Sequence, residues 1–133
     1  MKHYVTDTHP LVWYISKQAR KLPSKIKRVF DDAVDNQATI WIPLVVLWEM
    51  SLLLKARRFK MDVSLEELIT NNFFAKAIYL IDFLPEDIVR ASKLSFSRDP
   101  FDTLILACAQ RLELPLITGD LMLHESGLCQ IYW

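Results

Sequence analysis

The chain has 133 residues, of which 52% are hydrophobic and 24% are charged, and it contains only two glycines. This composition is typical of one packed domain, which we expect to span residues 1–133, and it excludes a disordered or low-complexity chain. The 16 basic and 16 acidic residues cancel to zero net charge, so any site for nucleic acid must be local.

The apolar segments are too short for a membrane span. The longest uncharged apolar run, 40–48, contains a proline and falls far below the roughly 20 residues that a span requires. The first residues lack the pattern of a secretory signal, so we expect a cytoplasmic protein with no membrane association. Cys108 and Cys129 lack CxxC spacing, which favours buried free thiols over a zinc or redox site.

The first part of the chain alternates short apolar strands with helices. The expected elements are a strand at 4–6, a helix beginning at Thr8 and Pro10, a helix capped by Ser24 that ends near Asn36, and a strand at 39–42. A long apolar helix follows, opened by Pro43 and running to about Arg58.

The pattern continues to the end of the sequence. The expected elements are a helix with the capping box Ser64 and Glu67, a strand at 77–81, helices beginning at Pro85 and at Asp99-Pro100, a strand at 115–118 and a small edge strand within 127–133. Short apolar strands that alternate with helices predict an α/β fold, with a short parallel sheet flanked by helices on both faces.

Four acidic residues stand alone in uncharged stretches. A carboxylate is costly to bury without a partner, so each of these isolated acids needs a reason to be there. They are Asp7, Glu49, Asp102 and Asp120.

Their positions in the expected fold converge. Asp7 and Asp120 follow two parallel strands, at the edge of the sheet where open α/β folds bind ligands. Asp102 lies in the first turn of a helix, and Glu49 lies about two turns into another. Four adjacent carboxylates would repel one another without a cation. Oxygen ligands with no histidine or thiolate at zinc spacing favour Mg²⁺ or Mn²⁺.

A capping role offers an alternative for three of the acids. Asp102 is placed to favour the helix dipole, and Asp7 and Asp120 are each placed to cap the turn or helix that follows them. Glu49 lies in mid-helix and has no such explanation, so a site explains it better than a solvated face.

The motifs around the acids carry a resemblance that covers essentially the whole chain. In order, they are YVTDTHPLVW at 4–13, VLWEMS at 46–51, RDPFDTLILA at 98–107 and LPLITGD at 114–120. This series resembles the PIN-domain nucleases, in particular the VapC-type toxins of bacterial toxin-antitoxin pairs. A single motif of this kind is weak evidence for the resemblance, whereas four motifs in the same order are specific evidence.

The resemblance implies a three-layer sandwich and an endoribonuclease that hydrolyses RNA phosphodiesters with metal-activated water. It implies Mg²⁺ or Mn²⁺ as cofactor and an inhibitory antitoxin as partner, and we also expect a homodimer. It assigns catalysis and metal binding to Asp7, Glu49, Asp102 and Asp120, with Asp99 and Thr118 as auxiliary residues. Gly119 departs from the Arg or Lys that is commoner at its position, which removes a cation near the scissile phosphate.

Two basic segments are candidates for contact with an RNA backbone. Their residues are Arg20, Lys21, Lys55, Arg57 and Arg58. Solvated ends of amphipathic helices are the alternative explanation, and the interspersed apolar residues favour it.

Other side chains receive structural interpretations. The three histidines, at 3, 9 and 124, share neither a helical face nor metal spacing. Trp13, Trp41 and Trp48 are expected to fill the core. Phe73 and Phe74 are candidates for a dimer or antitoxin groove, although a place in the core is the default interpretation for them too.

Two alternative functions remain open. The first is a non-catalytic α/β module that binds a metal or a partner, although the late lysine and paired acids of a phosphorylatable receiver are not visible. The second is an enzyme that acts on DNA or on phosphomonoesters. The turn after Asp7 lacks the second aspartate of aspartyl-phosphate phosphatases, which favours RNA.

Overall fold

The computed structural model describes residues 1–70, 77–95 and 99–133. Its strands form one parallel sheet in the order β3-β2-β1-β4-β5. The strands are β1 (Lys2–Thr6), β2 (Ala38–Pro43), β3 (Ile78–Ile81), β4 (Leu116–Ile117) and β5 (Ile131–Tyr132). The first strand of the chain is therefore the centre of the sheet, between β2 and β4.

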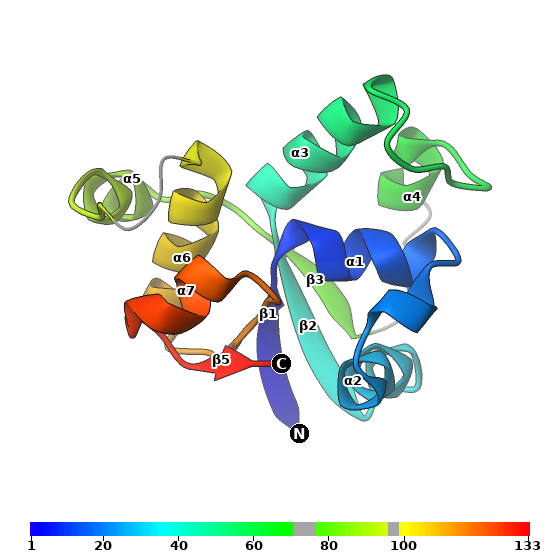
Figure 1. The fold of residues 1–133 in the computed structure, drawn as a ribbon, viewed down its shortest axis with the longest axis horizontal. Coiled ribbons are helices and arrows are strands. Elements are labelled where there is room, and N and C mark those ends of the chain that lie inside the picture. The colour runs from blue at the N-terminus through cyan, green and yellow to red at the C-terminus, as the bar shows by residue number, and fades with distance from the viewer. Residues whose placement is uncertain (71–76, 96–98) are drawn as a thin grey trace.

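Helices cover both faces of this sheet. They are α1 (Thr8–Ile15), α2 (Ser24–Val34), α3 (Leu44–Lys55), α4 (Leu65–Thr70), α5 (Pro85–Ser92), α6 (Pro100–Leu112) and α7 (Leu121–Ser126), with a short 3₁₀ turn at Ala19–Lys21. Figure 1 shows α1 and α2 on one side of the strands and α5, α6 and α7 on the other. The predicted α/β fold with a parallel sheet and two helical layers is confirmed.

The central strands form because their side chains are apolar on both faces. Val5, Ile40 and Leu116 are completely buried, and Val5 pairs with Leu116 across the β1–β4 boundary. A parallel sheet between two layers of helices needs strands of this kind, since neither face meets water. Phe30 from α2 and Leu106 from α6 close the core from the two sides.

Several boundaries differ from the sequence-based expectation. α3 ends at Lys55 rather than near Arg58, because Arg57 adopts the left-handed conformation, with φ 55°. Ser24 is the first residue of α2 and does not cap it, since Pro23 occupies the cap position. The short helix α7 was not expected. Phe73 and Phe74 lie outside the described residues.

The prediction that Trp48 fills the core is wrong. Its side chain is 56% exposed, and Leu52, one turn further along α3, is 36% exposed. Trp13 and Trp41 are partly buried and pack against the core, as expected. α3 carries apolar residues on every face, so the sequence does not reveal which face turns outward.

A buried ion pair joins the two helices on the second face. The carboxylate of Asp87 in α5 is fully buried and accepts a hydrogen bond of 2.7 Å from Nε of Arg111 in α6. Its second oxygen accepts a bond of 3.0 Å from the Leu84 backbone N–H, and Arg111 also donates to the Asp82 carbonyl at 3.2 Å. Both charges are therefore satisfied within the protein.

Among the described helices, none combines the length and the hydrophobicity that a membrane span requires.

The thiols of Cys108 and Cys129 are free, and burial raises the pKa of each to about 11. Cys108 is buried as expected, whereas Cys129 is only partly buried.

Candidate active site

The acids that are isolated in the sequence surround one cavity of about 300 Å³. It lies at the carboxyl ends of β1 and β4, and Figure 1 shows β1 running from the marked N-terminus towards the beginnings of α1 and α3. The cavity is lined by Asp7, His9, Pro10, Trp13, Glu49, Asp99, Asp102, Gly119, Asp120 and Trp133. All four predicted acids, and Asp99 with them, therefore meet in one place.

Asp7 is the most firmly held of these acids. It follows β1 directly and is only 6% exposed. Its Oδ1 accepts a hydrogen bond of 2.7 Å from the Thr8 backbone N–H, and its Oδ2 accepts one of 2.7 Å from the Thr118 hydroxyl. Its own N–H donates to the Ile117 carbonyl at 3.0 Å. Both the backbone and the carboxylate are thus fixed by the strand–turn junctions of β1 and β4.

Thr118 connects two of the acids. While its hydroxyl donates to Asp7, the same oxygen accepts a bond of 3.1 Å from the Asp120 backbone N–H. Its carbonyl lies 2.6 Å from Nε2 of His124 in α7. The side chain is completely buried, so it orients Asp7 and the start of α7 without competition from water.

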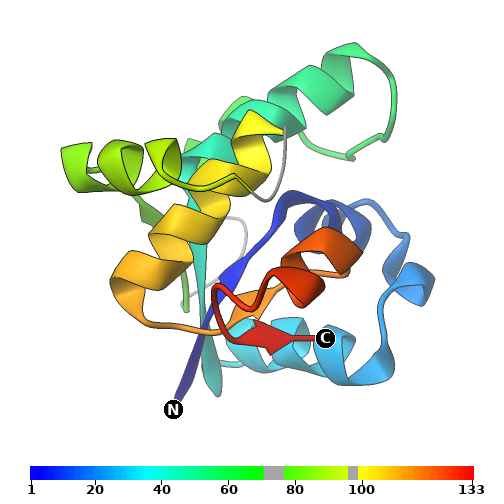
Figure 2. The same cartoon turned by 60° about the vertical axis from the view of Figure 1, so that its left-hand side comes forward.

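Glu49 reaches the cavity from α3, which packs beside the beginning of α6 (Figure 2). Its Oε1 accepts a hydrogen bond of 2.5 Å from the hydroxyl of the buried Thr8. The sequence predicts only a helix start at Thr8, so this bond to Glu49 is a second, unpredicted role of its side chain. Its position next to Asp7 in the opening motif is the signal that points to it.

The remaining acids sit at the beginnings of helices. Asp99 caps α6 by accepting from the Phe101 N–H at 2.8 Å, and Asp102 is the third residue of that helix. Asp120 caps α7 by accepting from the N–H groups of Met122 and Leu123 at 2.8 and 3.3 Å. Asp99 and Asp120 therefore cap helices and line the cavity with the same carboxylates, so the two explanations do not exclude each other.

The acids raise one another's proton affinity. Burial raises the pKa of Asp7, although the hydrogen bonds from Thr118 and Thr8 lower it in part. Burial also raises the pKa of Glu49, and the charges of Asp7 and Asp99 add to this effect. The pKa of Asp102 rises to about 7 because of burial first, and then because of its four carboxylate neighbours. Within the described residues, no lysine or arginine lines the cavity to offset this charge.

The donor set fits a hard divalent cation. Carboxylate oxygens are the ligands that Mg²⁺ and Mn²⁺ prefer, and no cysteine lines the cavity in the described part of the chain. No three side chains of the His, Cys, Asp and Glu types within 1–70, 77–95 and 99–133 are grouped as a ready-made metal site. Mg²⁺ keeps several waters and takes only one or two protein carboxylates, so it does not need such a group.

Replacing Asp102 by Asn is expected to stabilise the metal-free protein at pH 8 but not at pH 4. Because the pKa of Asp102 rises from 3.8 to about 7 on folding, the folded chain binds an extra proton between these values. The free energy of unfolding therefore falls as the pH rises from about 4 to about 7, a loss that the neutral Asn escapes. Melting temperatures of both proteins in chelator at the two pH values measure this, and equal values at pH 8 would contradict it.

The five cations predicted to contact RNA fall into two groups in the structure. Lys21 and Arg58 line a second cavity, which shares His9 and Trp13 with the acid-lined one. The other three candidates, Arg20, Lys55 and Arg57, line neither of these cavities, although all five cations are exposed. His9, for which the sequence favours a structural or solvent-facing role, thus lies at the border of the two cavities.

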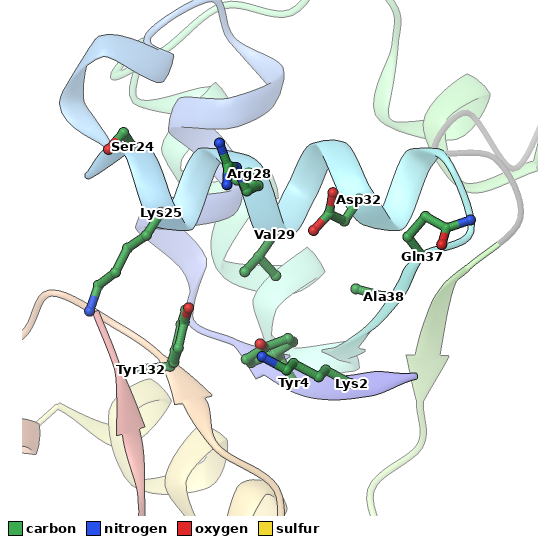
Figure 3. Close-up of a pocket in the computed structure, with 10 residues that line it drawn as sticks. All are labelled: Lys2, Tyr4, Ser24, Lys25, Arg28, Val29, Asp32, Gln37, Ala38 and Tyr132. Carbon is green, nitrogen blue, oxygen red and sulfur yellow. The ribbon is translucent and has the colours of Figure 1, made fainter.

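A further cavity, of about 380 Å³, lies near the beginnings of β1 and β2, away from the acids (Figure 3). It carries the cations Lys2, Lys25 and Arg28 and one acid, Asp32. The Lys25 ammonium lies 5.0 Å from the centre of the Tyr132 ring. This cavity lacks a group of acids for a metal, so we do not assign the chemistry to it.

Comparison with known proteins gives a family and a fold. The family model described as PIN domain matches residues 4–126. No curated protein matches the chain. The structure of VapBC2 from Rickettsia felis bound to a DNA fragment from their promoter is similar over 98% of this chain and 97% of that chain, with 17% identity and a TM-score of 0.67. The structure of DNA-bound VapBC from Salmonella typhimurium is similar over 99% and 98%, with 17% identity and a TM-score of 0.66.

Proposed function

The chain belongs to the PIN domain family, and from that premise we propose that it is a metal-dependent endoribonuclease. The observation that carries this proposal is the convergence of Asp7, Glu49, Asp102 and Asp120, with Asp99, on one cavity that has no lysine or arginine among its described lining residues. Such a cavity attracts a divalent cation and would repel an RNA phosphate without one.

The four acids are proposed to hold one or two Mg²⁺ or Mn²⁺ ions. A divalent ion there would lower the pKa of a bound water and offset the charge of the phosphate. The protein supplies orientation, because Asp7 is fixed by Thr8 and Thr118, and Glu49 is fixed by Thr8. It also restricts water on one side, where the rings of Trp13 and Trp133 line the cavity.

We further propose that the protein is the toxin of a toxin-antitoxin pair. The order of its motifs resembles VapC-type toxins, and the two structures named above, which share its fold, are of VapBC bound to DNA. An antitoxin that covers the toxin and binds DNA is the proposed partner, and a homodimer is the proposed assembly. Exposed Trp48 and Leu52 on α3 are apolar side chains that a protein partner would cover.

Cleavage assays test the activity. Purified protein is incubated with single-stranded RNA, double-stranded RNA and DNA, each with Mg²⁺, with Mn²⁺ and with chelator. We expect cleavage of RNA that depends on the added metal. Cleavage that persists in chelator, or cleavage of DNA alone, would refute the proposal. Metal binding without any cleavage would instead favour a non-catalytic module.

Thr118→Val is expected to weaken Mn²⁺ binding by about 10- to 100-fold, the usual effect of losing a residue that orients a metal ligand. Valine keeps the shape of threonine but cannot donate to Asp7 or accept from the Asp120 N–H. Titration calorimetry measures the affinity, with circular dichroism to confirm folding. Thr70→Val, at an exposed position in α4, is the matched control. Equal Mn²⁺ affinity in both variants would show that Thr118 does not orient the ligands.

A further inference from the structure

A second cavity adjoins the acid-lined one and has the opposite charge. It measures about 340 Å³ and is lined by side chains from α1, from the 3₁₀ turn, from α3 and from the residues that directly follow α3. His9 and Trp13 line both cavities, so the two meet at these rings. The charged residues of the second cavity are Lys21 and Arg58.

These two cations are not neutralised inside the protein. The Lys21 ammonium lies 5.8 Å from the centre of the Trp13 ring, and Arg58 is exposed. Neither forms an ion pair with a residue of the described ranges, in contrast to Lys27, which pairs with Asp31 at 2.7 Å. Two unpaired cations beside one cavity are suited to a phosphate, and a guanidinium presents donors that match its oxygens.

Aromatic rings line the boundary between the cations and the acids. The Trp13 ring lies 5.9 Å from His9 and 6.4 Å from Trp133, measured between centres. Trp133 lies so close over Gly119 that a Cβ there would be 2.7 Å from Cζ2 of the indole. The absence of a side chain at Gly119 thus allows the indole to sit in the wall of the acid-lined cavity. Aromatic faces beside cations are the common means of holding single-stranded nucleic acid.

We propose that the cavity around Lys21 and Arg58 is a nucleotide subsite for single-stranded RNA, next to the acids. Lys21 and Arg58 hold the phosphate adjacent to the scissile one, while Trp13 and Trp133 stack with a base between the two phosphates. The inference rests on the proposed ribonuclease function. It selects single strands because bases in a duplex are stacked on each other and cannot stack on a protein ring.

Binding without cleavage tests the subsite. A fluorescein-labelled unstructured RNA oligonucleotide is titrated with the full chain in chelator, and anisotropy is recorded at several salt concentrations. The variant Lys21→Gln/Arg58→Gln is expected to bind about tenfold more weakly, as for loss of one charge-assisted contact. When log affinity is plotted against log salt concentration, the slope for this variant is expected to be shallower by about 0.7. That value corresponds to the loss of one phosphate contact on a single strand.

The control keeps the same change of charge. Arg20→Gln/Arg57→Gln removes two cations that are neighbours of the first pair in the sequence but line neither cavity. We expect its affinity to stay within about twofold of the wild type, because cations outside the cavity do not contact the bound phosphate and act on it only through a screened field. If both double variants bind RNA with the same affinity and the same salt dependence, the subsite is refuted.

The stacking component has its own test. Trp133→Leu is expected to weaken binding of the oligonucleotide about tenfold, a typical effect for one base–aromatic stack. Trp133→Phe keeps an aromatic face and is expected to restore most of the affinity. A blunt-ended RNA duplex, whose bases are all paired, should bind both variants equally. Equal binding of the single strand to the Leu and Phe variants would refute stacking at this position.

The two proposals fail in different ways. If RNA binds through Lys21 and Arg58 but is not cleaved with any metal, the proposed activity is wrong and the subsite stands. If RNA is cleaved but the Lys21→Gln/Arg58→Gln variant behaves like its control, only the subsite is wrong. If that variant loses binding of an antitoxin while its RNA binding is unchanged, the cavity receives a protein and the subsite is again refuted.

Discussion

Asp7→Asn is expected to abolish metal-dependent RNA cleavage, with a loss of rate above the roughly 100-fold that outer residues of metal sites contribute. Both oxygens of Asp7 accept hydrogen bonds, which fixes the carboxylate at the edge of the cavity. Asparagine keeps the shape but removes the charge and replaces one oxygen with an amide nitrogen. The measurement is the single-turnover rate with saturating Mg²⁺ or Mn²⁺.

The same variant separates chemistry from folding. Burial raises the pKa of Asp7, so the metal-free carboxylate opposes folding, and its removal should leave the melting temperature unchanged or higher. Asp35→Asn, at an exposed position after α2, serves as the control for loss of one charge. An Asp7→Asn protein that is folded and still cleaves at the wild-type rate would place the chemistry elsewhere, or reveal a contaminating nuclease.

Asp87→Ala is expected to reduce the free energy of unfolding by about 3–5 kcal/mol, because it leaves the charge of Arg111 without its buried partner. It also removes the acceptor for the Leu84 N–H at the start of α5. Since a domain of this kind is stable by only about 5–15 kcal/mol, much of the stability depends on one carboxylate. Urea unfolding monitored by circular dichroism measures the loss.

An exposed ion pair provides the matched control. Lys17 and Asp62 lie 3.0 Å apart with both side chains 79% exposed, and Asp62→Ala is expected to cost less than about 1 kcal/mol. Replacing both Asp87 and Arg111 by leucine should recover part of the loss, because no charge is then left unpaired. A loss for Asp87→Ala no larger than that for Asp62→Ala would show that the buried pair does not hold α5 to α6.

The sheet and the meeting of the acids were predictable because they follow from local pattern and chain direction. A strand that is apolar on both faces belongs inside a parallel sheet, and the ends of parallel strands share one edge. This rule alone predicts that Asp7 and Asp120 lie at the same edge of the sheet. Their capping role was predictable too. The sequence offered capping and a site as alternative explanations, whereas in the structure the carboxylates that cap also line the cavity.

The contacts that fix the site were not predictable in the same way. Thr8 donates to Glu49 across 41 positions of sequence, and Thr118 donates to Asp7 across 111. Such pairs depend on how helices cross and on strand order, which no single segment specifies. The close approach of Trp133 to Gly119 is of the same kind. The exposure of Trp48 was not predictable for another reason. α3 lacks a polar face, so its sequence does not indicate which side is exposed to solvent.

The central place of β1 determines when the site forms during synthesis. β1 leaves the ribosome first, yet one of its two neighbours is β4, and the Thr118 hydroxyl that holds Asp7 comes more than a hundred residues later. A chain grows at about 5–20 residues per second, so Asp7 lacks its bond from Thr118 for several seconds after it has been made. The proposed site therefore cannot be complete until the chain has been made at least as far as Thr118 and Asp120.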